Sequence, residues 1–385
     1  MTRVLVVDDS RFMRTVIDNA LTDAGYDVET APNGSRAIDA VATDAPDVVT
    51  MDVEMPEIDG IEAVERIMAA DPTPILMLSA YTEAGAEATL DALERGAVDF
   101  LHKPDPKSAD AGARNIGHLA TEVVEKVDAL ADADVSSMAL ARTTASAQAT
   151  RPGTRSDAPA AARPVADPSG GSVEVAGSSS RVDPVSIDGT PTVVVGASTG
   201  GPKIVEHLFT RLPAALEARV LVVQHMPEGF TARFADRLDS LSEYDVREAT
   251  DGGRLDAGEA VVAAGDRHLE VARTVGGTLR LRLDDGERIH GVRPAIDVTM
   301  RSAAEWVDDP LCGVVLTGMG RDGAAGIEAI SDAGGHTIAQ DEATSPVFGI
   351  PCQAIQTGCV DDIAPAGEIA AEIVDAFRTD GETDE

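Results

Sequence analysis

Short apolar runs alternate with amphipathic stretches along the first third of the chain. The runs have the length and β-branched content of strands, and between them apolar residues recur at about every third or fourth position, as on one face of a helix. The predicted strands are residues 4–7, 27–30, 48–51, 75–78 and 98–101. The predicted helices are residues 11–24, 35–44, 59–70, 83–95 and 114–130. This alternation predicts an α/β domain with a doubly wound, parallel sheet over residues 1–128.

The pattern is lost over residues 129–189. This segment is rich in Ala, Ser, Pro, Gly, Thr and Asp and has few large apolar residues. Because it cannot bury enough apolar surface to offset the entropy of ordering, we expect a flexible linker. Residues 379–385 are polar and acidic, and we expect them to form a frayed tail.

Residues 190–378 form a second predicted domain. Apolar runs typical of strands occur at residues 192–195, 220–223, 260–264, 313–317 and 336–339. The pair Gly276-Gly277 separates two alternating runs, 269–274 and 278–283, as the turn of a β-hairpin does. We expect a second doubly wound, mainly parallel α/β sheet with an added antiparallel ribbon.

Acidic side chains dominate the composition, with 67 Asp and Glu against 31 Lys and Arg and a formal net charge of -36. Nucleic acid is excluded as a partner, since its phosphates are bound by clustered Lys and Arg and no basic stripe occurs here. The acids are spread along the whole chain, and the scarce lysines are Lys103, Lys107, Lys126 and Lys203. This spread favours a halophilic protein in a salt-rich cytoplasm, where screening shortens the reach of repulsion.

The cysteines and the apolar runs bear on the compartment. Cys312, Cys352 and Cys359 match no metal-ligand spacing and are interpreted as reduced core residues. The first apolar run is far shorter than the core of a signal peptide, and no long apolar stretch follows it. We therefore expect a cytoplasmic protein with no direct membrane insertion.

Polar residues follow the strands of the first domain. Asp8 and Asp9 follow the first strand, Asp52 the third, Ser79 the fourth and Lys103 the fifth. The carboxyl ends of parallel strands share one edge of a sheet, so these side chains should meet. A solvated loop position explains any single Asp better, but converging carboxylates repel one another unless a hard cation such as Mg²⁺ lies among them. A lysine opposite them suits a phosphoryl oxygen.

The second domain has a comparable arrangement around a serine. Gly196-Ala-Ser198-Thr-Gly200-Gly-Pro202 follows a strand and leads into a predicted helix, as at a turn that exposes a nucleophilic hydroxyl. A Gly-rich turn also binds phosphate, and Lys203 keeps that alternative open. His225 follows the next predicted strand, and Asp322 lies in a Gly-rich segment after the strand at 313–317. Asp322 is by default interpreted as the N-cap of the following helix. In the functional interpretation it orients the histidine that acts as general base, and the two roles can coexist.

The motifs of the first domain resemble the receiver domain of two-component response regulators. They are Val-Leu-Val-Val-Asp-Asp-Ser, Met-Asp-Val-Glu-Met-Pro-Glu-Ile-Asp-Gly, Leu-Ser-Ala and Phe-Leu-His-Lys-Pro. The resemblance implies a flavodoxin-like fold and phosphorylation of Asp52. It further implies that Asp8 and Asp9 form the acidic metal pocket, with Mg²⁺ bound by Asp9, Asp52 and the carbonyl of Glu54. Lys103 would hold the acyl phosphate, Ser79 and Phe100 would be the switch pair, and Lys103-Pro104 is a candidate cis peptide.

The motifs of the second domain resemble the chemotaxis receptor-glutamate methylesterases, the CheB family. They are Gly-Ala-Ser-Thr-Gly-Gly-Pro, Gln-His-Met-Pro, Gly-Asp-Arg-His and Thr-Gly-Met-Gly-Arg-Asp-Gly, and the resemblance covers residues 191–375 in a Rossmann-like domain. The order Ser, His, Asp differs from that of α/β-hydrolases. The resemblance implies Ser198 as nucleophile, His225 as general base, Asp322 as its partner and the Met319 N–H as oxyanion donor. Ala295 stands where the family usually has Ser, in a segment expected near the substrate groove.

The expected function is phosphorylation-activated hydrolysis of glutamate γ-methyl esters on chemoreceptors, with deamidation of receptor glutamines. A chemotaxis histidine kinase would be the phosphodonor, and the esterase reaction would need no cofactor. Two rivals are a receiver-linked DNA-binding regulator, which the missing basic recognition helix disfavours, and a serine esterase for small metabolites. Serine, histidine and aspartate alone do not separate the second rival from a receptor esterase.

Overall fold

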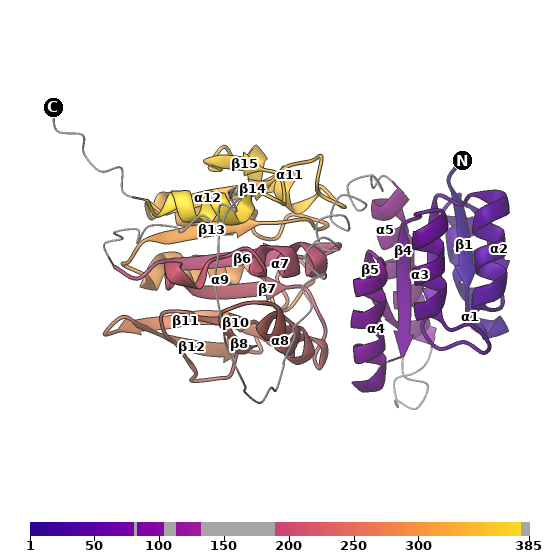
Figure 1. Ribbon diagram of the computed structural model, residues 1–385, viewed down its shortest axis with the longest axis horizontal. Helices are drawn as coiled ribbons and strands as arrows, with labels where there is room; N and C mark the ends of the chain where they lie inside the picture. The colour runs from indigo at the N-terminus through magenta and orange to yellow at the C-terminus, as the bar shows by residue number, and fades with distance from the viewer. Residues whose placement is uncertain (81–82, 104–112, 132–188, 379–385) are drawn as a thin grey trace, which may run out of the picture.

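The computed structural model describes residues 1–80, 83–103, 113–131 and 189–378 (Figure 1). Of the predicted linker at 129–189, residues 132–188 lie outside the described residues. The predicted tail at 379–385 also lies outside them. Pro104 is also outside them, so the predicted cis bond at Lys103-Pro104 stays a prediction. The cis peptide bond of the described residues is Arg293-Pro294.

The N-terminal domain is a parallel sheet of five strands in the order β2-β1-β3-β4-β5. Its strands are β1 (Arg3–Val7), β2 (Asp27–Ala31), β3 (Val48–Asp52), β4 (Ile75–Ala80) and β5 (Asp99–Lys103). Its helices are α1 (Arg11–Asp23), α2 (Gly34–Asp44), α3 (Gly60–Ala70), α4 (Glu83–Arg95) and α5 (Ala113–Ala131). α1 and α5 pack on one face of the sheet, and α2, α3 and α4 cover the other. The predicted doubly wound parallel fold is confirmed.

The C-terminal domain contains a parallel sheet of seven strands in the order β15-β14-β13-β6-β7-β10-β8 and an antiparallel sheet of three strands, β11-β12-β9. Its strands are β6 (Thr192–Ala197), β7 (Arg219–Gln224), β8 (Asp245–Glu248), β9 (Arg254–Leu255), β10 (Glu259–Val262), β11 (His268–Val275), β12 (Thr278–Asp284), β13 (Leu311–Val315), β14 (His336–Gln340) and β15 (Asp362–Ala364). Its helices are α7 (Gly201–Phe209), η1 (Ala214–Leu216), α8 (Phe230–Leu241), α9 (Ile296–Trp306), α10 (Ala324–Asp332), α11 (Ile350–Gln356) and α12 (Ile369–Ala376). The main sheet is fully parallel, and the β11-β12 hairpin is the predicted ribbon.

The order in which the chain adds strands to the main sheet reverses next to the central strand, β6. The chain runs from β6 to β7 and β10 on one side, and then returns to β13, β14 and β15 on the other side of β6. Loops that leave neighbouring strands in opposite directions open a crevice at the carboxyl ends of the strands, where ligands of open α/β sheets bind. The loops after β6, β7 and β13 therefore surround the place where a site is expected.

The two domains lie side by side, and α4, α5 and β5 of the N-terminal domain face the C-terminal domain (Figure 1). Phe100 of β5 stacks on Phe230 of α8 with ring centroids 4.9 Å apart. Arg237 of α8 pairs with Glu94 of α4 at 3.1 Å. An apolar contact and an ion pair thus join the same two faces.

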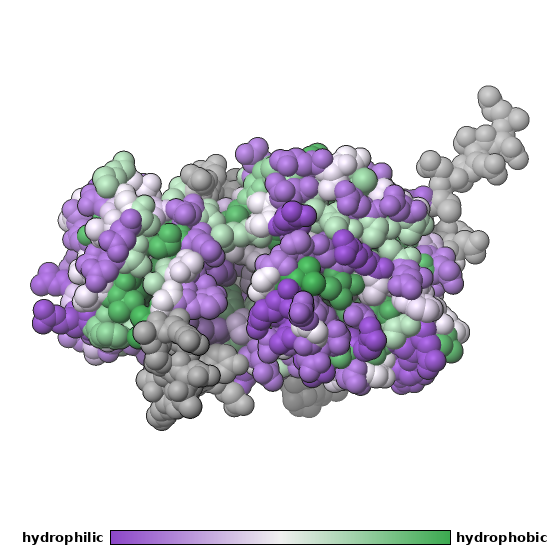
Figure 2. Space-filling view, turned by 180° about the vertical axis from the view of Figure 1, so that it is seen from behind, coloured by the Kyte–Doolittle hydropathy of each residue, from purple (hydrophilic) through white to green (hydrophobic). Residues whose placement is uncertain are grey.

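The outer surface is largely polar. Hydrophilic residues are spread over both domains on the face in Figure 2, with smaller apolar areas between them. All three cysteines are free, with Cys312 buried and the others partly exposed. Within the described ranges, no helix combines the length and the apolar character needed to cross a bilayer.

Candidate active site

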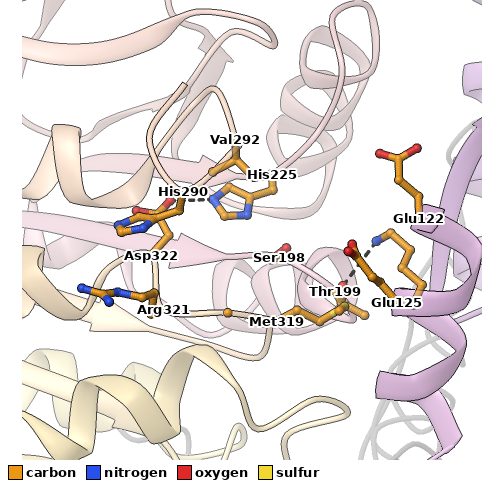
Figure 3. Close-up of a pocket in the computed structure, with 12 residues that line it drawn as sticks. Glu122, Glu125, Ser198, Thr199, His225, His290, Val292, Met319, Arg321 and Asp322 are labelled. Atoms are coloured by element: carbon orange, nitrogen blue, oxygen red, sulfur yellow. Dashed lines mark hydrogen bonds and ion pairs between the residues drawn. The ribbon is translucent and has the colours of Figure 1, made fainter. Parts of the chain in front are cut away.

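Ser198, His225 and Asp322 line one cavity at the carboxyl edge of the main sheet (Figure 3). Ser198 follows β6, His225 follows β7, and Asp322 lies in the loop between β13 and α10. The N–H of Ser198 donates to the Thr317 carbonyl at 3.0 Å, and the N–H of His225 donates to the Ala197 carbonyl at 3.0 Å. The hydrogen-bond ladder of the sheet therefore continues past the strand ends and fixes the backbone of both residues.

The histidine and the aspartate form a direct pair. His225 Nε2 lies 2.8 Å from Asp322 Oδ2, and the Asp322 residue is only 2% exposed. Burial by itself raises the pKa of the Asp322 carboxyl, but the hydrogen bond and charge of His225 and two backbone N–H groups outweigh it and hold that pKa below its usual range. Asp322 is thus an ionised acceptor that favours the His225 tautomer with its proton on Nε2. Nδ1 of the imidazole is then free to accept a proton from a serine hydroxyl.

The turn around Ser198 is tight. Gly200 has a φ of +76°, which is a left-handed conformation that favours glycine. The side-chain amide of Gln224 donates to the Ser198 carbonyl at 2.9 Å. Among the described residues, however, the Ser198 hydroxyl has no hydrogen-bond partner, so it shares the cavity with His225 without a bond to the imidazole. Catalytic hydrogen bonds are often this loose before substrate binds.

Asp322 does cap a helix, but not the one expected from the sequence. Its carboxylate accepts the N–H groups of Ile296 at 2.7 Å and Asp297 at 3.0 Å, at the start of α9. The following helix, α10, has Gly323 at its N-cap position without a side-chain cap. The prediction of an N-cap for the following helix is therefore wrong, because the loop after β13 turns the carboxylate toward the neighbouring helix.

Ala295 occupies the N-cap position of α9 and has no side-chain cap of its own. It is fully buried and is not among the residues that line the cavity. Its N–H donates to His268 Nδ1 at 3.2 Å. The cap of α9 is therefore supplied by Asp322 and not by the residue at the N-cap position.

Two backbone N–H groups are available beside Ser198. Within the described residues, those of Thr199 and Met319 make no hydrogen bond, and both residues line the cavity. Unpaired N–H groups at a turn are the usual donors to an oxyanion. The alternative of a phosphate-binding turn loses support here, because the lysine that lines the cavity is Lys126 of α5, while Lys203 does not line it.

The predicted acidic cluster of the N-terminal domain is assembled at the carboxyl edge of its sheet. Ligand oxygens of Asp8, Asp9 and Asp52 all lie within 4.8 Å of one another. Lys103 Nζ lies 2.7 Å from both Asp8 Oδ2 and Asp52 Oδ1. Burial raises the pKa of Asp52 to about 6, although Lys103 opposes this shift. Three converging carboxylates and one lysine fit a divalent cation and a phosphoryl group, and Glu54 lines an adjoining cavity with Asp9.

The predicted switch residues lie toward the domain interface. The Ser79 hydroxyl is fully buried and donates to the carbonyl of Gly85, in the first turn of α4, at 3.2 Å. Phe100 is 6% exposed and forms a three-ring cluster with His102 and Phe230, in which the His102 and Phe230 centroids are 4.5 Å apart. Ser79 therefore joins β4 to α4 within the receiver, and Phe100 joins β5 to α8 of the C-terminal domain.

Helix α5 lies at the mouth of the cavity (Figure 3). Glu122, Glu125 and Lys126 of this helix line the cavity together with Ser198. Lys126 Nζ pairs with Asp99 and lies 3.3 Å from the hydroxyl of Thr199, the neighbour of Ser198. A segment of the N-terminal domain therefore contacts the residue next to the serine.

The structure also adds residues that sequence reasoning missed. His290 lines the cavity and lies 2.9 Å from the buried Asp297. Asp297 belongs to the segment Arg293-Pro-Ala-Ile-Asp297. From the sequence, Ala295 in this segment is considered as a departure from the family pattern, but no role is predicted for the aspartate. Neither residue comes directly after a strand, so the strand-edge argument could not find them.

Comparisons with known proteins identify relatives of both domains. The family model for CheB methylesterase matches residues 193–373, and the model for the response regulator receiver domain matches residues 4–109. The chain is 51% identical to the protein-glutamate methylesterase/protein-glutamine glutaminase of Halobacterium salinarum, over 98% of this chain and 99% of that protein. Proteins of the same name from Haloarcula marismortui and Archaeoglobus fulgidus are 48% and 39% identical, over 98% and 97% of each chain. The chain therefore belongs to the CheB methylesterase family, with a response regulator receiver domain at its N-terminus.

Proposed function

We propose that the chain hydrolyses glutamate γ-methyl esters on chemoreceptors, releasing methanol, and deamidates receptor glutamines, under the control of phosphorylation. The observation that carries this proposal is the hydrogen bond between His225 and a buried, ionised Asp322, in one cavity with Ser198. The names of the full-length relatives supply the substrate class, a protein glutamate or glutamine side chain.

In the proposed reaction the Ser198 oxygen attacks the γ-carbonyl carbon of the substrate. His225 takes the hydroxyl proton at Nδ1, while Asp322 stabilises the imidazolium through Nε2–H. The N–H of Met319 donates to the oxyanion. The same proton then passes to the leaving oxygen, and methanol departs to leave an acyl-serine. Water attacks this ester with His225 as base, which restores the serine and leaves the receptor side chain as a free glutamate carboxylate. A glutamine follows the same steps with ammonia as leaving group.

The receiver domain would be phosphorylated on Asp52 by a chemotaxis histidine kinase in the cytoplasm. Asp8, Asp9, Asp52 and the carbonyl of Glu54 would hold Mg²⁺, which supplies positive charge against the phosphoryl oxygens during transfer. Lys103, which already contacts Asp52, would pair with a phosphoryl oxygen.

Phosphorylation would act on access to Ser198. Glu125 and Lys126 of α5 stand at the cavity mouth, and Phe100 is held against α8. Pulling Lys103 and Ser79 toward a phosphoryl group would shift β4 and β5 and weaken this packing. The receiver would then uncover the cavity for a receptor helix.

The test is methanol release from radiomethylated receptor membranes, measured with and without a phosphodonor. We expect Ser198→Ala to lose at least about a thousandfold of the activity, because the acyl-serine cannot form without the Ser198 hydroxyl. The variant should still take up phosphate. Esterase activity near that of the wild type would refute the nucleophile assignment.

Asp52→Asn is the matched control for the regulatory half of the proposal. It should keep the unphosphorylated rate and show no rise with kinase and ATP, whereas a rise would contradict the switch. Hydrolysis of small esters at the rate seen with receptor would instead favour a metabolite esterase, the second candidate raised by the sequence.

A further inference from the structure

A second histidine–aspartate pair stands beside the first one. His290 Nε2 lies 2.9 Å from Asp297 Oδ2, just as His225 Nε2 lies 2.8 Å from Asp322 Oδ2. One ligand atom each of His290, Asp297 and Asp322 falls within 4.8 Å of the other two. Both aspartates are 2% exposed. Two carboxylates this close and this deeply buried need donors on both sides to stay ionised.

The two aspartates cap each other's helices. Asp322, which precedes α10, accepts the N–H groups of Ile296 and Asp297 at the start of α9. Asp297, in the first turn of α9, accepts the N–H groups of Gly323 at 2.9 Å and Gly326 at 2.8 Å at the start of α10. Each carboxylate therefore lies against the positive end of a helix. Neither aspartate can turn without releasing the segment that carries the other.

The two carboxylate oxygens of Asp297 have different hydrogen-bond donors. Both backbone N–H groups bind Oδ1, and His290 is the donor to Oδ2 among the described residues. Without His290 this oxygen would be buried, unpaired and near the Asp322 carboxylate. A buried acceptor that loses its partner is unfavourable, so Asp297 would turn toward another donor. This turn would loosen the loop that holds Asp322 against His225.

The backbone at His290 supports a specific role for its side chain. His290 and Gly291 have φ values of 53° and 80°, and Ile289 and Val292 exchange both hydrogen bonds around them. This is the geometry of a two-residue turn that favours Asn-Gly or Gly-Gly, and a histidine there is less usual. The turn also places Val292 on the cavity wall beside His225 (Figure 3).

We propose that His290 is a positioning residue for the esterase reaction: through Asp297 it holds Asp322, and with it His225, in the orientation that activates Ser198. This role rests on the proposed function of the cavity. His290 acts through the carboxylate pair and the turn, and it does not contact the reacting atoms.

Two substitutions separate the donor from the turn. His290→Gln keeps an N–H group at about the reach of Nε2 but is strained at positive φ, whereas His290→Gly fits the turn and removes the donor. We expect the glycine variant to lose roughly tenfold or more in kcat with little change in KM, and the glutamine variant to retain most of the rate, in the range seen for partners of catalytic ligands. If only the turn mattered, the order would be reversed. A glycine variant as active as the glutamine variant, or more so, would overturn the proposal.

The assay uses the full chain with saturating phosphodonor and methylated receptor membranes. The rate at which a generic fluorophosphonate labels Ser198 is measured in parallel, because it reports serine activation without any receptor. A wild type that fails to release methanol would count against the proposed function, whereas equal labelling of wild type and His290→Gly would count against the positioning role alone.

The chain offers a matched control at the opposite edge of the same sheet. His336, at the amino end of β14, has its Nε2 2.7 Å from Asp362 Oδ2 and is not among the residues that line the cavity. His336→Gly removes a histidine–aspartate pair in the same way. It should leave kcat and the labelling rate at wild-type values, so that a loss with His290→Gly is attributable to position and not to loss of a pair in general.

Discussion

A glycine on the neighbouring strand end holds Ser198 in place. A Cβ atom on Gly318 would lie 2.6 Å from the Cβ of Ser198 and 2.6 Å from Cδ1 of Ile350. The Gly318 carbonyl accepts the N–H groups of Gly349 and Ile350 at 3.0 and 2.7 Å, so the glycine backbone is not free to move away. The serine turn therefore rests on a backbone contact that no larger residue allows.

We expect Gly318→Ala to lower kcat on the order of 10–100-fold, because the added methyl group must push Ser198 or the α11 segment aside. The fold should survive with a loss of about 1–3 kcal/mol in the free energy of unfolding. Methanol release and urea denaturation of the same preparation check both values.

Gly367→Ala is the control for this substitution. A Cβ atom there meets nothing within 4 Å, and its φ lies outside the left-handed region. It should leave both kcat and the urea midpoint unchanged. Full activity of Gly318→Ala would show that the serine turn yields without consequence.

How much of the site follows from the sequence depends on where each residue stands relative to a strand. Ser198, His225 and Asp322 could be brought together because each follows an apolar run and parallel strands share one carboxyl edge. His290 and Asp297 lie on a turn and at a helix start, for which no comparable rule fixes a place in space. Their roles depend on the packing of α9 against α10, which a single sequence does not specify.

Most of the strands, and the five helices of the receiver, were predictable. Strands β1, β3 and β4 of the receiver and strands β6, β7 and β13 of the C-terminal domain have clear apolar runs with β-branched residues. The strands that escaped prediction are β8, β9 and β15, which have 4, 2 and 3 residues. Such short strands at sheet edges carry too few side chains for a period to appear, and pairing with neighbours makes them strands.

Strand β5 and helix α8 form an aromatic contact that responds to protonation. His102 of β5 packs against Phe230 of α8 and Phe100. Burial lowers the pKa of His102 from 6.5 to about 4. Part of this burial comes from Phe230, so separation of the domains would return the imidazole toward its ordinary pKa.

The sign of the effect follows from this shift. The docked form favours neutral His102, so the docking free energy is fully present above about pH 6.5 and is lost as the pH falls toward 4. At about pH 5.5 the loss amounts to at most about 1.4 kcal/mol. We expect the ratio of phosphorylated to unphosphorylated esterase rates to shrink between pH 7.5 and 5.5, since acid partly releases the receiver.

Using the ratio removes the pH dependence of the chemistry itself, which is common to both states. His102→Phe keeps an aromatic ring against Phe230 and removes the titrating group. Its ratio should be independent of pH over the same interval. A ratio that falls equally in this variant would assign the effect to another group.

Across the whole chain, the excess of acidic residues makes the stability of the folded protein depend on ionic strength. The net charge of -36 is not concentrated at one site, and ion pairs such as Arg282–Glu270 and Arg66–Glu62 leave a large excess of acids, because the chain has 67 Asp and Glu but only 31 Lys and Arg. Exposed pairs of this kind contribute little to stability. Most of the acids therefore repel one another in the folded state, and the effect grows as the ionic strength falls.

We expect salt to stabilise the folded chain. The Debye length is about 10 Å at 0.1 M and about 3 Å at 1 M salt, so molar salt leaves only near neighbours among the surface carboxylates interacting. The midpoint of urea unfolding should rise between about 0.1 M and about 2 M KCl. Sucrose at matched water activity serves as the control, since it favours the compact state without screening charge. A midpoint that KCl leaves unchanged, or that sucrose raises by the same amount, would mean that repulsion among the acids does not limit the stability of this protein.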